Sequence, residues 1–387
     1  MKQPPGFTHP DYPHHVYKLT KAIYRLKQAP RAWFHRFSSF LVTKGFICSK
    51  TDNSMFIYCS SLGVLILLLY VDDIILTGSH SHLLVQFIDR LSHKLAMKDL
   101  GDLHYFLGVH AVRTSHGLHL CQQKYIVDLL LKFHMHTCKL VRTPIASRIC
   151  VAFEDGNLLS DPSEYKSTVG ALQYLTMTHP DIAHAVNIVS QFLHAPRTTH
   201  MHCVKRIFRY LQGTPTYGLF LRASSSNSVV TAYSDADWAG CPDTRHSTTG
   251  YVVFLGSNLI SWHAKKQPTV FKSSTEAEYR AIAYTVAETT WIRHILCELR
   301  IYLRQPVGVF CDNVSSTYMC RNSVFHDRSK HIDVHFHYVR DKVSQGDLVV
   351  KYVPTQLQVV DIITKGLSSS HFCFLRDNLS VTTCRPD

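Results

Sequence analysis

The first strong pattern along the chain is a run of apolar residues interrupted by charge. Residues 64–70 are apolar throughout, Val71, Asp72 and Asp73 follow, and residues 74–78 resume the apolar pattern. Apolar runs of this length on either side of a short polar interruption predict strand, tight turn and strand. The sequence therefore predicts two adjacent carboxylates at the tip of a buried hairpin.

The middle of the chain changes to helical spacing. Ile182, Val186 and Val189 share one predicted helix face, and Ile207 and Leu211 share another. Prolines and glycines interrupt these runs. We therefore expect several short helices in this segment.

The C-terminal segment has a third pattern, in which strands come first and helices later. Strands are predicted at residues 229–233, 250–255, 258–263, 307–311 and 348–353, and helices at about residues 275–300, from residue 330 to 346, and around residues 359–365. Three strands, a helix, and then alternating strand and helix are typical of an α/β layer with a mixed sheet. We expect that sheet to have five strands.

Two changes in composition divide the chain into three predicted domains, residues 1–140, 141–227 and 228–387. A small-residue polar run at residues 223–228 marks the second boundary. The predicted fold class is thus multidomain, combining α/β and α+β parts.

Composition and charge add an expected class of partner. The chain has 387 residues, 45% hydrophobic and 18% charged, which favours folded domains over disorder. A formal net charge of +13 favours a polyanionic partner, although a generally basic protein would show the same balance.

The longest apolar run is far shorter than the roughly 18 residues that a membrane span needs, and the first residues do not resemble a signal peptide. We therefore expect an intracellular protein, cytoplasmic or nuclear, of undetermined oligomeric state.

The adjacent Asp72 and Asp73 have two interpretations. Hard carboxylate oxygens suit Mg²⁺ with its waters and substrate phosphates, whereas an Asp-Asp hairpin turn can also be simply solvated. Three segments in order, AIYRLKQAPRAW at residues 22–33, YVDD at residues 70–73 and KDLGDLHYFLG at residues 98–108, resemble the reverse transcriptase of copia-type LTR retrotransposons.

This resemblance implies roles for four residues. Asp72 and Asp73 would be two of three palm carboxylates that hold two metal ions, and Lys27 and Gln28 would lie by the incoming nucleotide and the template. The family's third carboxylate precedes a Gln-Pro-Pro-Gly-Phe box, and here the chain begins at that box. Arg25 stands where the family usually has glycine, which crowds the nucleotide site. We predict a palm and thumb remnant, without fingers and first palm strand, that does not polymerise DNA alone.

Four acidic residues each lie at the end of a predicted C-terminal element. Asp235 follows the first strand, Glu278 lies in the first turn of the long helix, Asp312 follows the fourth strand, and Asp361 lies on the terminal helix. Each also has a structural interpretation: Asp235 competes with a solvated Asp237, Glu278 could cap a helix, Asp312 could lie in a strand-end turn or cap a helix, and Asp361 could be a surface charge. Four carboxylates on one rim would instead bind two metal ions.

Four boxes around these residues, YSDADWAG at 233–240, SSTEAEYRA at 273–281, CDN at 311–313 and VDIITK at 360–365, resemble copia-type ribonuclease H. The resemblance implies a ribonuclease H-like domain whose metal carboxylates are Asp235, Glu278, Asp312 and Asp361. It also implies two Mg²⁺ ions, for which Mn²⁺ can substitute, and an RNA–DNA hybrid as substrate.

Basic segments supply candidate nucleic-acid contacts. The segment with Lys330 and His331 matches a basic stretch between the family's third and fourth boxes, although a solvated helix face explains it equally well. Lys205, Arg206 and Arg209 lie in a segment that resembles the family's thumb and connection, and phosphate contacts there would position a duplex.

Three functional hypotheses follow. The first is a ribonuclease H attached to a palm, thumb and connection remnant. The second is an inactive remnant that still binds nucleic acid, and the third is the downstream portion of an active polymerase completed by upstream sequence or other parts of the polyprotein. Hybrid cleavage, salt-sensitive binding without cleavage, and primer extension separate the three.

Overall fold

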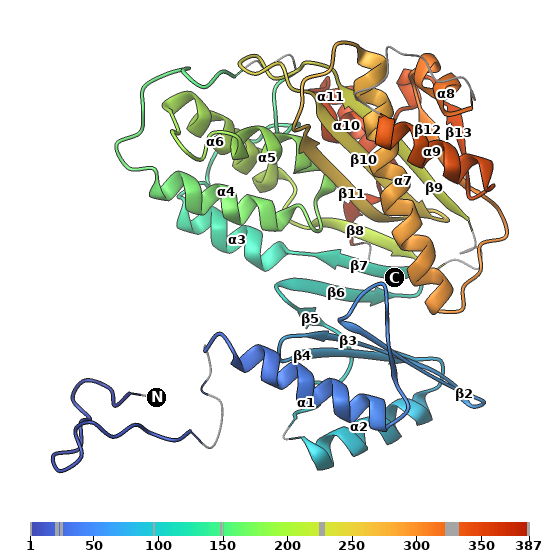
Figure 1. Cartoon of the computed structure of the whole chain (residues 1–387). Coiled ribbons are helices and arrows are strands. Elements are labelled where there is room, and N and C mark those ends of the chain that lie inside the picture. Colours follow the sequence, from blue (N-terminus) through green and yellow to red (C-terminus); the bar gives the residue numbers. More distant parts are fainter. Residues whose placement is uncertain are drawn as a thin grey trace. The chain divides into compact units, whose positions relative to one another are not determined.

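The structure is a computed structural model that describes residues 2–384 except residues 20–22, 24, 25, 96, 148, 150, 224–228 and 322–332. It divides into two compact units, Met1–Gly101 and Asp102–Asp387 (Figure 1). Each unit is described by itself. Within the described residues, no helix has both the length and the apolar character that crossing a bilayer requires.

The first unit is an antiparallel sheet with two helices. Its strands pair in the order β1-β2-β3-β4. Their bounds and those of the helices are α1 Ala29–Thr43, β1 Ile47–Cys48, β2 Met55–Ser60, β3 Gly63–Tyr70, β4 Asp73–Gly78 and α2 Ser81–Lys94. Phe37 and Leu41 from α1 and Phe87 and Leu91 from α2 share one core with alternate residues of β3.

The predicted strand, turn and strand are confirmed as β3 and β4, but the hairpin is buried on one face only. Leu65 and Leu67 are buried, while Leu68 is 38% exposed and Tyr70 is 56% exposed. Successive side chains of a strand point to opposite faces, so a wholly apolar run does not by itself require two buried faces.

The second unit contains two sheets. The first pairs in the antiparallel order β14-β8-β7-β6-β5. Its strands are β5 Tyr105–Phe106, β6 Val109–Thr114, β7 Gly117–Cys121, β8 Tyr217–Arg222 and β14 Val381–Thr383. The helices predicted for the middle of the chain are confirmed; the helical elements of this region are α3 Gln123–Lys132, α4 Ser163–Leu175, the 3-10 turn η1 Pro180–Ile182, α5 Ala183–Ser190 and α6 Thr198–Gly213.

The second sheet confirms the predicted mixed five-stranded arrangement. Its order is β11-β10-β9-β12-β13, with β11, β10 and β9 antiparallel and β9, β12 and β13 parallel. The elements are β9 Val230–Asp237, β10 Thr248–Leu255, β11 Asn258–Lys266, α7 Ser274–Glu298, β12 Val307–Cys311, α8 Val314–Arg321, α9 Asp333–Ser344, β13 Leu348–Tyr352, the 3-10 turn η3 Thr355–Leu357, α10 Asp361–Thr364 and α11 Ser369–Asn378.

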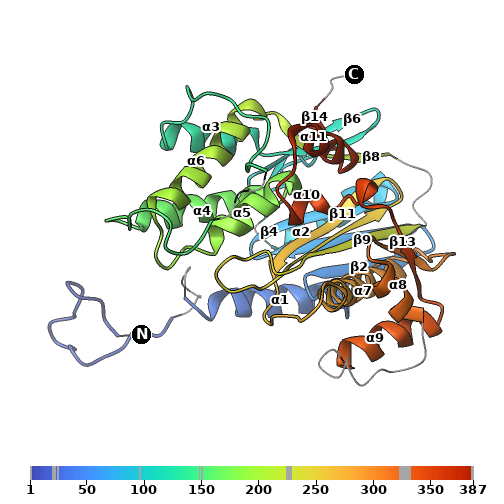
Figure 2. The same cartoon turned by 90° about the horizontal axis from the view of Figure 1, so that it is seen from above.

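Strand β10 is buried on both faces, which explains its continuous apolar sequence. Tyr251 and Val253 join the core beneath α7, while Val252 and Phe254 join a second core formed with α5, α6 and α10. Figure 2 shows α7 on one side of this sheet and α10 on the other. A strand covered on both sides must carry apolar residues at consecutive positions.

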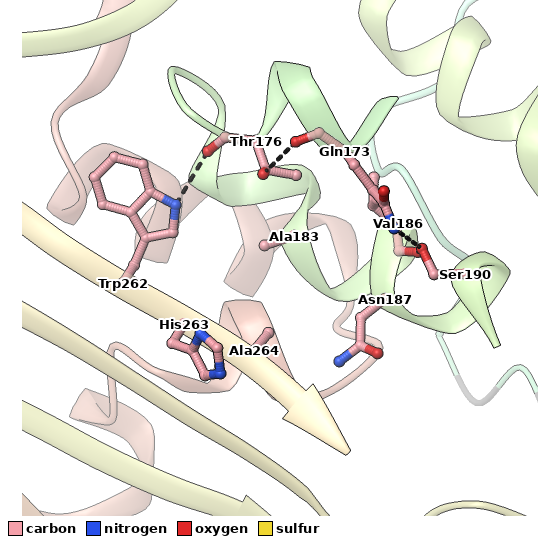
Figure 3. Close-up of a pocket in the computed structure, with 9 residues that line it drawn as sticks. All are labelled: Gln173, Thr176, Ala183, Val186, Asn187, Ser190, Trp262, His263 and Ala264. Carbon is pink, nitrogen blue, oxygen red and sulfur yellow. Dashed lines mark hydrogen bonds between the residues drawn. The ribbon is translucent and has the colours of Figure 1, made fainter. Parts of the chain in front are cut away.

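The helices of the middle segment pack against β11. Figure 3 shows the indole of Trp262 directed at helix α4, where its Nε1 donates to the Thr176 carbonyl oxygen at 3.0 Å. The C-terminal strand β14 also pairs with β8, so the middle and C-terminal segments share backbone hydrogen bonds as well as a core. The three predicted domains, residues 1–140, 141–227 and 228–387, stay a prediction about which segments fold independently.

Candidate active site

The four predicted carboxylates come from four elements at one end of the mixed sheet. Asp235 lies within β9, two residues before the strand ends, and not after it as predicted. Glu278 is the fifth residue of α7 and so lies beyond its first turn, contrary to the prediction. Asp312 directly follows β12, as predicted, and Asp361 begins the short helix α10, after which α11 and β14 still follow.

Glu278 and Asp312 form one half of this cluster with Cys311. One ligand atom from each of the three residues lies within 4.8 Å of the others. The Cys311 thiol lies 3.6 Å from Glu278 Oε2 and donates to it. The Thr355 hydroxyl donates to Asp312 Oδ2 at 2.9 Å, which holds that carboxylate from the opposite side.

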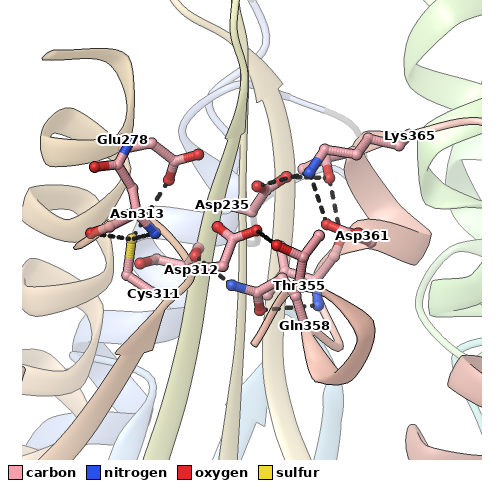
Figure 4. Close-up of polar contacts among 12 residues, drawn as sticks. Asp235, Glu278, Cys311, Asp312, Asn313, Thr355, Gln358, Asp361 and Lys365 are labelled. Atoms are coloured by element: carbon pink, nitrogen blue, oxygen red, sulfur yellow. Dashed lines mark hydrogen bonds and ion pairs between the residues drawn. The ribbon is translucent and has the colours of Figure 1, made fainter. Parts of the chain in front are cut away.

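Asp235 and Asp361 form the other half around Lys365. Lys365 Nζ lies 3.0 Å from Asp235 Oδ1 and 2.8 Å from Asp361 Oδ1. The Thr364 hydroxyl donates to Asp235 Oδ2 at 2.5 Å. Figure 4 shows Asp235 and Asp312 between Glu278 on one side and Asp361 with Lys365 on the other, so the two halves face one another.

Burial and mutual repulsion perturb these groups. Asp235 is fully buried, and Glu278 and Asp361 are 6% and 4% exposed. Burial, and then the neighbouring Asp235 and Asp312, raise the pKa of Glu278 well above its usual range. Burial and the Asp235 charge likewise raise the pKa of Asp361 to about 7, partly offset by Lys365. Crowding of the four carboxyl groups around one lysine therefore favours the protonated forms of Glu278 and Asp361 when no metal is bound.

The structural interpretations of Glu278 and Asp312 as helix caps are wrong. Ser273 is the N-cap of α7, and its side chain accepts from the Glu276 backbone N–H. Asn313 Oδ1 accepts from the Ser316 backbone N–H at 2.9 Å and so caps α8. Both carboxylates are therefore free of capping and directed toward the cluster.

The competing residue Asp237 is not the solvated group that the sequence suggested. It is half-buried, and burial raises its pKa. A Cβ added at Gly240 would meet Asp237 Oδ2 at 1.6 Å, so the Asp237 carboxylate packs against the following loop. Of these two residues, it is Asp235 that pairs with Lys365, and Lys365 also pairs with Asp361.

The donor set fits a hard divalent cation. Carboxylate oxygens are the ligands that Mg²⁺ and Mn²⁺ prefer. Burial, and then the Glu278 charge, raise the pKa of the Cys311 thiol, which disfavours it as a thiolate ligand relative to the carboxylates. The crowded carboxylates therefore indicate a divalent-metal site.

The two predicted palm carboxylates lie in the first unit, where Asp72 is on the turn after β3 and Asp73 is the first residue of β4. Asp72 and Asp73 are both exposed. Val71 has a φ of +54°, a left-handed conformation that costs energy for a β-branched residue. The Trp33 indole N–H donates to the Val71 carbonyl oxygen at 2.6 Å and ties the turn to α1.

The remaining predicted contacts differ in exposure. Lys27, Gln28 and Lys205 are exposed, which leaves them available to a ligand. Arg206 donates to the Thr143 hydroxyl at 3.0 Å and Arg209 to the Lys139 carbonyl oxygen at 2.6 Å, so both guanidinium groups hold the loop before α4. The predictions for Arg25, Lys330 and His331 fall outside the described residues.

Sequence reasoning did not single out Lys365, although Asp361 and Lys365 are four residues apart, a spacing that signals an ion pair on a helix. Gln358 was also missed; it is fully buried and donates to the Ser234 carbonyl oxygen at 3.0 Å, beside Asp235. No local sequence pattern predicts the contact between Gln358 and Ser234, because the two residues are 124 positions apart.

Comparison with known proteins gives matches along the chain. Residues 1–147 match the family described as "Reverse transcriptase (RNA-dependent DNA polymerase)". The chain is 48% identical over 386 residues to the retrovirus-related Pol polyprotein from transposon RE1 of Arabidopsis thaliana, which covers 100% of this chain and 26% of that polyprotein. The chain thus spans about a quarter of that relative.

A shorter relative is covered almost completely. The chain is 33% identical over 291 residues to a Saccharomyces cerevisiae protein assigned to transposon Ty5-1, covering 74% of this chain and 94% of that one.

Among solved structures, the foamy viral protease-reverse transcriptase in complex with RNA/DNA hybrid has a TM-score of 0.46 and 11% identity, over 75% of this chain and 36% of that one.

Proposed function

The chain belongs to the copia-type family of retrotransposon Pol polyproteins, and on that premise we propose that residues 228–387 of its second unit are a ribonuclease H. It would hydrolyse the RNA strand of RNA–DNA hybrids with divalent cations. One observation carries the proposal: Asp235, Glu278, Asp312 and Asp361 converge from four elements, and three of them are buried. One lysine, Lys365, pairs with two of these carboxylates, so keeping all four together would be costly unless further cations bind.

Two Mg²⁺ ions, or Mn²⁺ in their place, would generate the attacking hydroxide and stabilise the leaving oxygen of a phosphodiester when bound. Asp235, Glu278, Asp312 and Asp361 would hold them. The Cys311 thiol and the Thr355 hydroxyl would orient Glu278 and Asp312 by the hydrogen bonds that they already donate. Hydrogen bonds from neighbouring residues commonly fix the orientation of side chains that bind a metal ion.

The substrate would be recognised by shape. An A-like hybrid exposes phosphates and 2′-hydroxyls, which a protein of net charge +13 can contact without reading sequence. The exposed Lys205 is a candidate for such a phosphate contact, as are Lys330 and His331 from the sequence. Arg206 and Arg209 are weaker candidates because each already holds a loop. Other parts of the polyprotein are further candidate partners.

Hybrid cleavage tests the proposal. The purified chain should cut the RNA strand of a labelled hybrid in Mg²⁺ and leave the matching DNA duplex intact, and Asp312→Asn should abolish the cutting. An Asp312→Asn protein that cuts as well as the wild type would overturn the assignment. Salt-sensitive hybrid binding without cleavage would favour the inactive binding remnant instead.

A separate observation, made in the first unit, supports a second function. The strained Val71, held by Trp33, presents Asp72 and Asp73 to solvent, which suits two carboxylates of an RNA-directed DNA polymerase site. Lys27 and Gln28 would serve the same site beside the nucleotide and template. Primer extension on an RNA template, run on the preparation used for hybrid cleavage, tests this function. The sequence-based expectation of no extension by this chain alone stays a prediction.

A further inference from the structure

Lys365 places one ammonium group between two buried carboxylates of the proposed metal site. The Asp235 and Asp361 side chains are 0% and 6% exposed, whereas the Lys365 side chain is 34% exposed. Its nitrogen is within hydrogen-bonding distance of both carboxylates at once. Lys365 therefore reaches from the protein surface into the cluster and neutralises part of its charge.

The fold fixes this position through helix α10. Asp361 and Lys365 are separated by one helical turn, and the Thr364 hydroxyl binds Asp235 from the same helix. A Cβ added at Gly250 would meet Thr364 Cγ2 at 2.4 Å and Val360 Cγ1 at 2.8 Å, so α10 lies directly on β10. The lysine is held at the cluster by backbone packing and is not a loosely attached surface charge.

The Lys365 charge also acts beyond its direct contacts. It lowers the pKa of Glu278, Asp361 and Asp237, against the burial and the repulsion among the carboxylates that raise these values. In a protein without bound cations, such a group offsets part of the cost of keeping several carboxylates buried together.

We propose that Lys365 is a resident counter-ion that a divalent cation must displace from Asp235 and Asp361. This inference rests on the proposed function, because it concerns the same site. An ammonium and a divalent ion cannot both occupy the space between the same carboxylate oxygens, because like charges repel and the oxygens have limited room. Lys365 thereby holds the site together before metal binds and weakens metal binding by competition.

The structure has room for the displaced side chain. Lys365 and Thr364 line a cavity of about 290 Å³ together with Asp237, Gln191 and Cys241. The Asp237 carboxylate offers an alternative partner inside that cavity. The ammonium can thus leave the two ligands without being left buried and unpaired.

Mn²⁺ binding in the absence of nucleic acid tests the competition directly. Free Mn²⁺ is measured by electron paramagnetic resonance during titration of the wild type, Lys365→Met and Lys342→Met. Lys342 is the matched control because it pairs with Asp347 at 3.0 Å, outside the cluster, and is similarly shielded at 23% exposure. Lys365→Met should bind Mn²⁺ about tenfold more tightly than the wild type, and Lys342→Met should not differ from it.

Equal or weaker Mn²⁺ binding by Lys365→Met would overturn the competition while leaving the metal site intact. No Mn²⁺ binding by folded wild type or by Lys365→Met would instead refute the proposed metal site, and this inference with it. The two failures are therefore distinguishable.

A measurement on the wild type covers the case in which Lys365→Met does not fold. Amine acetylation is quantified at each lysine by mass spectrometry, with and without saturating Mg²⁺. Labelling of Lys365 should increase severalfold when Mg²⁺ binds, because its ammonium leaves both carboxylates, and labelling of Lys342 should stay constant. Unchanged labelling of Lys365 at saturating Mg²⁺ would overturn the proposal.

Discussion

The β3–β4 hairpin end that carries Asp72 and Asp73 and the cluster around Asp235 both present acidic residues, but they do so under opposite physical conditions. Asp72 and Asp73 are exposed, and water solvates them on a turn that one hydrogen bond from Trp33 holds. Asp235 and Glu278 are buried, and the sheet and helices around them hold them in place. Solvated carboxylates need no cation, whereas burying several together is costly unless cations or bound protons offset their charge. Metal dependence should therefore be concentrated in the second unit.

The largest expected effect comes from removing a buried carboxylate. Asp235→Asn should lower hybrid cleavage by about a thousandfold or more, because Asp235 would help to hold the proposed ions, and these would contribute several kcal/mol of transition-state stabilisation. Steady-state cleavage of a labelled hybrid measures this. Asp73→Asn removes a carboxylate of the first unit and should leave cleavage unchanged. A comparable loss in both variants would break the contrast between the two regions.

Stability without metal should fall as pH rises, because the pKa of Asp361 is raised from 3.8 to about 7. A carboxyl whose folded pKa exceeds its unfolded value contributes stability that is complete below about pH 4. That contribution is lost as pH rises toward 7, by at most about 4 kcal/mol for this shift. Urea unfolding in EDTA at pH 5 and pH 8 measures it.

Asp361→Asn is the control for this pH dependence. The variant should lose less stability than the wild type between pH 5 and pH 8, and Mg²⁺ should restore the wild type at pH 8. Identical pH profiles for the two proteins would show that Asp361 is not perturbed.

The close packing of β10 against α10, next to Asp235 and Asp361, should not tolerate even one added methyl group. Gly250→Ala forces a Cβ against Thr364 and Val360. It should cost about 1–3 kcal/mol in unfolding free energy, and it should reduce cleavage by displacing α10. Gly170→Ala in α4 meets nothing within 4 Å and should be neutral or slightly stabilising. Equal denaturation midpoints for both variants would contradict this account.

The smallest expected effect lies in the first unit. Trp33→Phe removes the hydrogen bond to the Val71 carbonyl oxygen and should cost about 1 kcal/mol locally. Amide hydrogen exchange at residues 71–73 should accelerate, while exchange in β9 and β10 stays the same. Faster exchange in both units would mean that the turn is not the element that Trp33 holds.

The sequence predicted the elements well where apolar periodicity is unbroken. Strand β12 was predicted at its observed bounds, because a buried strand shows as a short apolar run. The end of β9 was not, because Ser234, Asp235 and Asp237 are polar yet continue the ladder with β10. Functional residues interrupt the hydrophobic pattern from which strands are predicted.

Contacts between residues far apart in the chain could not be predicted from local sequence patterns. The pairing of β14 with β8 joins Val381 to Leu219, and no local signal specifies such a partner. The capping roles were also misassigned: Ser273 is the N-cap of α7, which leaves Glu278 for the cluster. The four carboxylates were found through their resemblance to a family, whereas Lys365 emerged only from its position in the fold.

Anomalous diffraction from crystals grown with Mn²⁺ tests the central claim most directly. The account predicts manganese peaks within bonding distance of Asp235, Glu278, Asp312 and Asp361, with Lys365 moved away from Asp235 and Asp361. Well-ordered side chains at these four positions with no manganese between them, at a Mn²⁺ concentration that supports hybrid cleavage, would contradict it.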